Sequence, residues 1–333
     1  MCTIARIFVY AIFGLFMPLL AAEAVETDPP LTARNAVEAA NIIMEHHMPA
    51  LPERCRPVLV RVLDNAASRK NVHQEWLDVY NQGCIGGRAE LADINGVQIA
   101  KSALYKEWWS TPAWQYDKVQ TKVWAKMIGE VRYINLKNFY ESDLRVTLRA
   151  LATEKPLPSG GYIVDMRGSG GGYIWAAHTL GMLFAKNTAE PVMFRTTRQG
   201  TDSMVVEKPG ELSDKPLVVL VDQDSASTAE MAVCMLTQNK AARGVLMGKK
   251  THGKGNGAWN LQIPGKLRIT YTRYTFSCPG KDGKEVLVDG KGIEPDIRLP
   301  DADLKVTSFT ENDKAITAAL QQLAVIKQLA ATR

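Results

Sequence analysis

One serine and one lysine in this chain stand where a nucleophile and its base could meet. Ser227 follows the apolar run 217–221, which predicts a buried strand, and it precedes a predicted helix. This placement carries the serine hydroxyl to a strand end, where a substrate can reach it. Lys254 lies between two glycines on a predicted loop. Because a serine needs a base to attack at neutral pH, and a desolvated lysine can be that base, we predict a Ser-Lys catalytic pair.

These residues also have simpler structural interpretations. Ser225 or Ser227 could only cap the following helix, and Lys254 could be a solvated loop lysine. His252 and His178 add another alternative, a Ser-His mechanism. The choice between these interpretations depends on the motifs that accompany the pair.

A glycine-rich loop, DMRGSGGG at residues 165–172, lies between a predicted strand and a predicted helix. Glycines expose backbone N–H groups, and a helix start adds positive potential, so such a loop can hold a phosphate or a developing oxyanion. The loop has neither the lysine of a P-loop nor the G-x-G-x-x-G fingerprint of dinucleotide-binding folds. A tight strand-to-helix turn is its structural alternative.

Four motifs in order resemble those of the tail-specific (carboxyl-terminal processing) serine proteases, over about residues 128–300. They are DMRGSGGG (165–172), SASTAE (225–230), THGKG (251–255) and GKGIEPD (290–296). The resemblance implies an α/β fold with a ClpP/crotonase-like core of strands and helices, a polypeptide substrate, and no need for a metal or nucleotide cofactor.

The resemblance also assigns roles by position. Ser227 would be the nucleophile and Lys254 the general base. The N–H groups of Thr228 and Gly171 would hold the oxyanion; many relatives have proline, which lacks an N–H, just before the position of Gly171. Glu230, one helical turn after the serine, would orient the lysine or order the site. Ser225, the first serine of its motif, would be structural.

Departures from the family pattern bear on the third catalytic member. Ala258 stands four residues after the lysine, where relatives often have a glutamine that orients it. Ser169 replaces an asparagine, Ala229 a third serine and His252 a phenylalanine. The missing glutamine leaves two possibilities open: Glu230 takes its role, or the site is slower.

Composition limits the partners of the chain. The 333 residues are 46% hydrophobic and 23% charged, with a net charge of +5, and the basic residues are scattered. This is ordinary globular composition without the basic patch of a nucleic-acid-binding protein. The cysteines lack metal-ligand spacing such as C-x-x-C. The oligomeric state stays open, a homo-oligomer included.

The first 24 residues have the pattern of a secretory signal peptide. A short basic start precedes the uncharged apolar run 7–20, and Ala22 and Ala24 place small residues before a cleavage site. A membrane anchor is the alternative, but 14 residues fall short of the roughly 20 that span a bilayer. We therefore expect an exported protein, periplasmic or secreted, with no stable membrane span after cleavage.

The cysteines that remain would meet an oxidising compartment, which permits disulfides. Cys55 and Cys84 flank a helical segment and could pair. Cys234 falls on the expected buried side of the helix after Ser227, which predicts a free core thiol.

Periodicity predicts the elements that position these motifs. Helices are expected at 31–47, 57–67, 72–80, 142–152, 174–184, 228–238 and 315–329. Strands are expected at 119–127, 130–136, 162–165, 192–197, 217–221, 244–247, 258–263 and 267–274. This alternation predicts an α/β core with parallel strands.

The predicted division of the chain has four parts: signal peptide (1–24), N-terminal helical unit with a short hairpin (25–115), protease core (116–305) and C-terminal helix (306–333). The hairpin is expected around Asn95-Gly96. Its sequence resembles one piece of a PDZ domain, but the segment 84–114 is too short for a complete one.

The sequence thus predicts an exported serine endopeptidase that cleaves polypeptides, near C-termini by resemblance, through an acyl-enzyme. One alternative is a non-catalytic peptide- or ligand-binding module on the same scaffold. Another is an esterase or amidase that acts on small molecules.

Overall fold

The computed structural model describes most of the chain after residue 30. The described residues are 31–68, 72–85, 90–93, 98–101, 124–139, 148, 151–153, 156–186, 190–206, 209–239, 244–306 and 309–332. The expected signal peptide and most of the expected helix 142–152 lie outside them. No helix in these ranges is long and apolar enough to cross a bilayer.

One of the two sheets has six strands, in the order β14-β10-β9-β6-β5-β4. Its strands are β4 (Trp124–Ile128), β5 (Val131–Asn135), β6 (Gly161–Asp165), β9 (Leu217–Val221), β10 (Val245–Gly248) and β14 (Ile297–Arg298). Every neighbouring pair is parallel except β4 and β5. The predicted α/β class with parallel pairing is confirmed.

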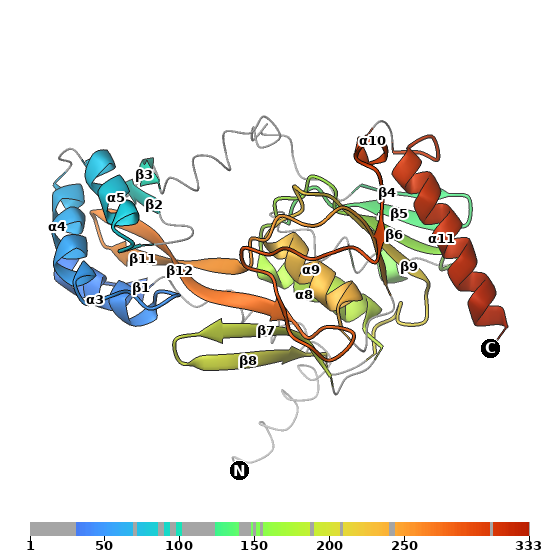
Figure 1. Cartoon of the computed structure of the whole chain (residues 1–333), viewed down its shortest axis with the longest axis horizontal. Helices are drawn as coiled ribbons and strands as arrows, with labels where there is room; N and C mark the ends of the chain where they lie inside the picture. The colour runs from blue at the N-terminus through green and yellow to red at the C-terminus, as the bar shows by residue number, and fades with distance from the viewer. Residues whose placement is uncertain are drawn as a thin grey trace, which may run out of the picture.

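Helices cover both faces of this sheet (Figure 1). α8 (Ile174–Phe184) and α9 (Thr228–Thr237) lie on one face, and α11 (Lys314–Ala331) lies on the other. On β9, Val219 packs in the α8–α9 cluster and Val218 in the α11 cluster. A strand buried on both faces is apolar at every position, which explains the unbroken run at 217–221.

A second sheet joins the core to the opposite end of the molecule, in the order β1-β11-β12-β2-β3; β7 and β13 also pair with β12, and β8 pairs with β7. Its strands are β1 (Leu31–Thr32), β2 (Glu90–Asp93), β3 (Gln98–Lys101), β7 (Pro191–Thr197), β8 (Gly200–Val205), β11 (Asn256–Ile263), β12 (Leu267–Cys278) and β13 (Val286–Leu287). The long pair β11–β12 runs from the core to the N-terminal helices (Figure 1). The predicted hairpin is present as antiparallel β2 and β3, with its turn outside the described residues.

Three N-terminal helices pack on the outer part of β11 and β12: α3 (Ala36–His46), α4 (Cys55–Ala67) and α5 (Val72–Asn81). Trp76 is fully buried, in one cluster with Leu261, Ile269 and Tyr271. We call these helices, with β1–β3 and the outer parts of β11 and β12, the arm. Its core therefore combines residues about 200 positions apart. The division of the chain into domains and the expected lack of a complete PDZ domain stay predictions.

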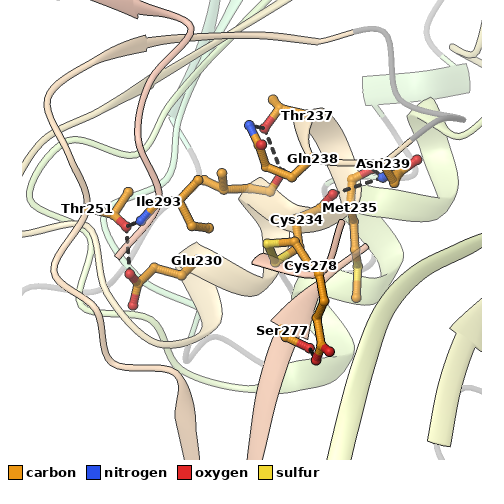
Figure 2. The surroundings of a disulfide bond; sticks show 12 residues. Glu230, Cys234, Met235, Thr237, Gln238, Asn239, Thr251, Ser277, Cys278 and Ile293 are labelled. Carbon is orange, nitrogen blue, oxygen red and sulfur yellow. Dashed lines mark hydrogen bonds between the residues drawn. A yellow bond between two sulfur atoms is a disulfide. The ribbon is translucent and has the colours of Figure 1, made fainter. Parts of the chain in front are cut away.

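Two disulfides are present, one in the arm and one in the core. Cys55 bonds to Cys84, as the sequence analysis allowed. Cys234 bonds to Cys278, so the prediction that Cys234 is a free thiol is wrong. Figure 2 shows the reason: the end of β12 passes beside α9 and brings the two side chains together.

The four-residue helix α10 (Asp301–Leu304) precedes α11.

Candidate active site

Ser227 lies between the end of β9 and the start of α9, as predicted. It is the N-cap residue of α9, and its backbone N–H donates to the carboxylate of Glu230 in the first turn of that helix. Its backbone has φ 58° and ψ −119°, and no other non-glycine residue in the described ranges has a positive φ. Such a conformation costs energy and persists only where the surroundings impose it, a pattern that clusters at active sites. The residue is partly exposed, so a ligand can reach it.

Ser225 has the structural role that its position predicted. Its buried hydroxyl donates to the carbonyl oxygen of Met166 at 2.8 Å and accepts the N–H of Asp222 at 3.0 Å. The Asp222 carboxylate accepts the N–H of Gly168 at 2.9 Å. Because Met166 and Gly168 lie in the glycine loop, these bonds fix that loop against the segment that carries Ser227.

Gly171 places its backbone directly beside the serine. A Cβ atom on it would lie 2.6 Å from the Thr228 nitrogen and 2.9 Å from the Ser227 Cβ, and its φ is +88°. Only glycine fits this approach. Neither the Gly171 nor the Thr228 N–H donates to an acceptor in the described part of the chain. The two predicted oxyanion donors therefore lie together, next to the candidate nucleophile.

The lysine loop is built on contacts between backbones. The Gly253 carbonyl accepts the N–H of Gly290 at 2.8 Å, and a Cβ on Gly253 would lie 2.8 Å from the Gly292 nitrogen. The backbone of the motif at 290–296 thus packs against the backbone of the lysine loop. Lys254 is partly buried, and its Nζ donates to Asn256 Oδ1 at 3.2 Å.

Glu230 joins the serine segment to the lysine loop. Its Oε2 accepts the N–H of Ser227 at 2.9 Å and the N–H of Lys254 at 2.8 Å. Its Oε1 accepts the hydroxyl of Thr251 at 2.6 Å and the N–H of Gly253 at 2.7 Å. Figure 2 shows the carboxylate reaching from α9 toward Thr251. Of the two roles that the sequence left open for Glu230, these contacts match ordering of the site.

The Glu230 carboxyl is fully buried, and its environment acts on its pKa in two directions. Burial raises the pKa and the four hydrogen bonds lower it, and the net result is a pKa of about 7. Every donor is an uncharged hydroxyl or backbone amide. The ionisation of this group is therefore sensitive to pH near neutrality.

Among the hydrogen bonds of the described residues, the Ser227 N–H donates to Glu230 Oε2 and Lys254 Nζ donates to Asn256 Oδ1. Burial lowers the pKa of both His178 and His252; for His252 a hydrogen bond with the Gln223 backbone and the charge of Asp224 oppose this effect, and the charge of Lys254 adds to it. The described residues also hold no cluster of three or more His, Cys, Asp or Glu side chains suited to a metal ion.

Comparison with known proteins identifies the family. The profile of peptidase family S41 matches residues 130–299, which is just over half of the chain. The chain belongs to peptidase family S41. The resemblance found in the sequence is therefore confirmed, and the S41 match covers all four motifs.

Curated relatives of this S41 chain are named carboxyl-terminal-processing proteases. That of Synechocystis sp. is 30% identical over 146 residues, covering 43% of this chain and 33% of that protein. That of Picosynechococcus sp. is 28% identical over 209 residues, covering 62% of this chain and 48% of that protein. The S41 chain thus matches between a third and a half of the length of these relatives.

Two solved structures share the fold over most of the S41 chain. A lipoprotein from Streptococcus agalactiae has a TM-score of 0.56 at 13% identity, covering 86% of this chain and 99% of that one. A structure from Parabacteroides merdae has a TM-score of 0.51 at 16% identity, covering 86% and 94%. At these identities the likeness concerns the fold alone.

A buried ion network in the S41 chain was not foreseen from the sequence. Arg167 Nη2 lies 2.6 Å from Asp165 Oδ2, and Arg167 Nη1 lies 3.1 Å from Asp313 Oδ1; all three side chains are inaccessible to solvent. Asp313 also caps α11 through the N–H groups of Ala315 and Ile316. The first and third residues of the glycine-loop motif thus fasten the C-terminal helix. The D-x-R pattern in the first motif was the available clue.

Proposed function

We propose that this chain is an exported serine endopeptidase that cleaves polypeptides with Ser227 as nucleophile and Lys254 as general base. Membership of peptidase family S41 and the names of the curated relatives support the reaction class. One observation carries the choice of residues: a single buried carboxylate, that of Glu230, accepts the backbone N–H groups of both Ser227 and Lys254.

In the first step, Ser227 Oγ attacks the scissile carbonyl carbon while its proton passes to Lys254 Nζ. A C–O bond forms and the carbonyl electron pair moves to its oxygen, which the N–H groups of Gly171 and Thr228 stabilise. The lysine ammonium then gives its proton to the amide nitrogen, and the C–N bond breaks to leave an acyl-enzyme. Water attacks the ester, Lys254 takes its proton, and the proton returns to the departing serine oxygen.

This chemistry does not require a short Ser227–Lys254 hydrogen bond in the free protein, because catalytic hydrogen bonds are often long before substrate binds. The positive φ of Ser227 supports a nucleophile that is held in place before reaction. Lysine accepts a proton only when it is neutral. Activity should therefore fall on the acid side, as Lys254 becomes protonated.

We extend the proposal to substrate and location. The names of the relatives favour cleavage near the C-termini of polypeptides. Two disulfides fit an oxidising compartment, which supports export to the periplasm or beyond. The pattern of the first 24 residues supports the same route.

The test is a proteome-derived peptide library, with cleavage products identified by mass spectrometry. Wild type should release new C-termini, Ser227→Ala and Lys254→Ala should release none, and Ser203→Ala, at an exposed serine of β8, should match wild type. Cleavage by Ser227→Ala would refute the mechanism. Capture of peptides without cleavage by wild type would instead favour the binding module, the alternative that the missing glutamine at Ala258 suggests.

A further inference from the structure

Lys254 has a side-chain partner that the family pattern does not predict. Its Nζ donates to Asn256 Oδ1 at 3.2 Å, and Asn256 Nδ2 donates to Asp289 Oδ1 at 2.6 Å. Asn256 is the first residue of β11, two positions after the lysine. The position where relatives often have glutamine, Ala258, cannot make such a bond.

The chemistry of the two neighbours fixes the orientation of the Asn256 amide. A lysine Nζ offers a hydrogen to Oδ1, and a carboxylate can only accept one, so the amide nitrogen must face Asp289. A reversed amide would bring N–H against N–H and oxygen against oxygen. The chain from Lys254 through Asn256 to Asp289 therefore has a single direction of donation.

We propose that Asn256, held by Asp289, is the positioning residue for Lys254 and takes the place of the glutamine missing at Ala258. The inference rests on the proposed function of Lys254 as the base. A neutral lysine has two N–H groups and one lone pair. When Asn256 accepts one N–H, rotation about the last bond of the lysine is restricted, and the lone pair can be aimed at the Ser227 hydroxyl.

An amide suits this position better than a carboxylate would. A carboxylate in contact with Nζ favours the charged ammonium, which cannot accept a proton. In this chain the amide separates the lysine from the negative charge of Asp289. The hydrogen bond to Asp289 also polarises the amide and strengthens Oδ1 as an acceptor.

The backbone holds Asp289 at a fixed place relative to the lysine loop. A Cβ on Gly255 would lie 2.1 Å from the Asp289 nitrogen, so the two segments touch there without an intervening side chain. The Gly255 carbonyl also accepts the N–H of Phe276 from β12 at 2.8 Å. The backbone of Asp289 is thus packed directly against the loop that carries the base.

The first experiment measures how Lys254 titrates, independently of catalysis. The full chain is acetylated with limiting acetic anhydride across a pH series, and mass spectrometry quantifies the peptide that contains Lys254. Asn256→Asp should raise the titration midpoint by about one unit or more, because it places a carboxylate on Nζ. Asp289→Asn should lower the titration midpoint of Lys254, by less than Asn256→Asp raises it. Asn260→Ala, at an exposed asparagine of the same strand, should leave it unchanged.

The second experiment measures kcat and KM on the best-cleaved library peptide, made as a fluorophore–quencher substrate. Asn256→Ala should lower kcat about tenfold or more with little change in KM, as for one lost hydrogen bond to the base. The acid limb of the Asn256→Asp profile should move to higher pH. The double variant Asn256→Ala with Ala258→Gln should recover part of the lost kcat.

Unchanged titration of Lys254 in both Asn256→Asp and Asp289→Asn would overturn the proposal, and each variant remains a test if the other fails to fold. If Asn256→Ala kept the wild-type kcat while Lys254→Ala showed no cleavage, the proposed role of Asn256 would be overturned and the proposed function would stand. Absence of any cleavage by wild type would overturn the proposed function and with it the positioning role, whereas the acetylation series would report separately whether Asn256 contacts Lys254.

Discussion

Two buried acids, Asp165 and Glu230, organise different regions of the molecule with different chemistry. Asp165, at the end of β6, pairs with the Arg167 guanidinium, which also pairs with Asp313 at the start of α11. Glu230, on α9, accepts four hydrogen bonds from uncharged groups of the serine segment and the lysine loop. One network holds the C-terminal helix on the sheet; the other holds the candidate active site.

The two networks differ in whether a cation neutralises the buried acid. In the first network a cation offsets the buried acids, so every member depends on the others. In the second no cation lies among the donors, and the Glu230 carboxyl has a pKa of about 7 because burial opposes its ionisation. The first network is thus suited to hold the C-terminal helix by ion pairing, and the second links the order of the site to pH.

The largest effect is expected from removing the shared cation. Arg167→Met keeps much of the side-chain volume but leaves Asp165 and Asp313 buried without their partner. We expect the free energy of unfolding to fall by about 3–5 kcal/mol in urea titrations. The control is Arg195→Met, whose pair with Asp202 is exposed and should be worth less than about 1 kcal/mol. Equal losses in the two variants would contradict the role of the network.

Glu230→Gln should affect activity more than stability. Both carboxylate oxygens accept hydrogen bonds, so the new NH₂ group must face two N–H or O–H donors. We expect the free energy of unfolding to fall by about 1–3 kcal/mol. Displacement of the serine and lysine loops should lower peptide cleavage about a hundredfold. A variant that loses stability while keeping wild-type kcat would show that Glu230 does not order the site.

Stability should depend on pH through Glu230. Between its ordinary value of 4.5 and about 7, the folded protein retains the proton on Glu230 while the unfolded chain has lost it. Unfolding then releases a proton, so the free energy of unfolding falls as pH rises, by about 2–3 kcal/mol across the window. Urea titrations of wild type and Glu230→Gln at pH 5 and 7.5 isolate the effect, since the buried histidines are common to both. Parallel pH profiles would contradict it.

Most of the core was predictable because its elements carry local patterns. The predicted bounds of β9 and α8 match the structure, since an unbroken apolar run and a regular helical period leave little choice. Motif order then predicted that Gly171, Ser227 and Lys254 belong to one site. Backbone geometry that only glycine tolerates explains why these motifs are visible in a single sequence.

The remainder depends on contacts between distant segments, which a single sequence does not encode in any local pattern. Cys234 was predicted to be a free thiol because its partner Cys278 is 44 positions away, on a strand whose path past α9 is tertiary information. The pairing of the arm helices with β11 and β12 is of the same kind. Asn256 lies close to Lys254 in sequence, but the hydrogen bond that holds its side chain goes to Asp289, 33 positions away.

The smallest effect is expected at a third carboxylate, which tests whether burial or bond pattern decides the outcome. Asp222 is 9% exposed, and burial raises its pKa. Its Oδ1 accepts all three of its hydrogen bonds in the described chain, from Gly168, Asp224 and Ser225.

Asp222→Asn can therefore keep Oδ1 in place and turn its NH₂ group to the other side. We expect the free energy of unfolding to change by less than about 1 kcal/mol, with kcat near that of wild type, in the same urea and cleavage assays. Glu230→Gln is the matched comparison, because there both oxygens are occupied. If Asp222→Asn were as damaging as Glu230→Gln, the loss of a buried charge would explain both variants. The hydrogen bonds of both Glu230 oxygens to the serine segment and the lysine loop would then not be needed to explain the effect of Glu230→Gln.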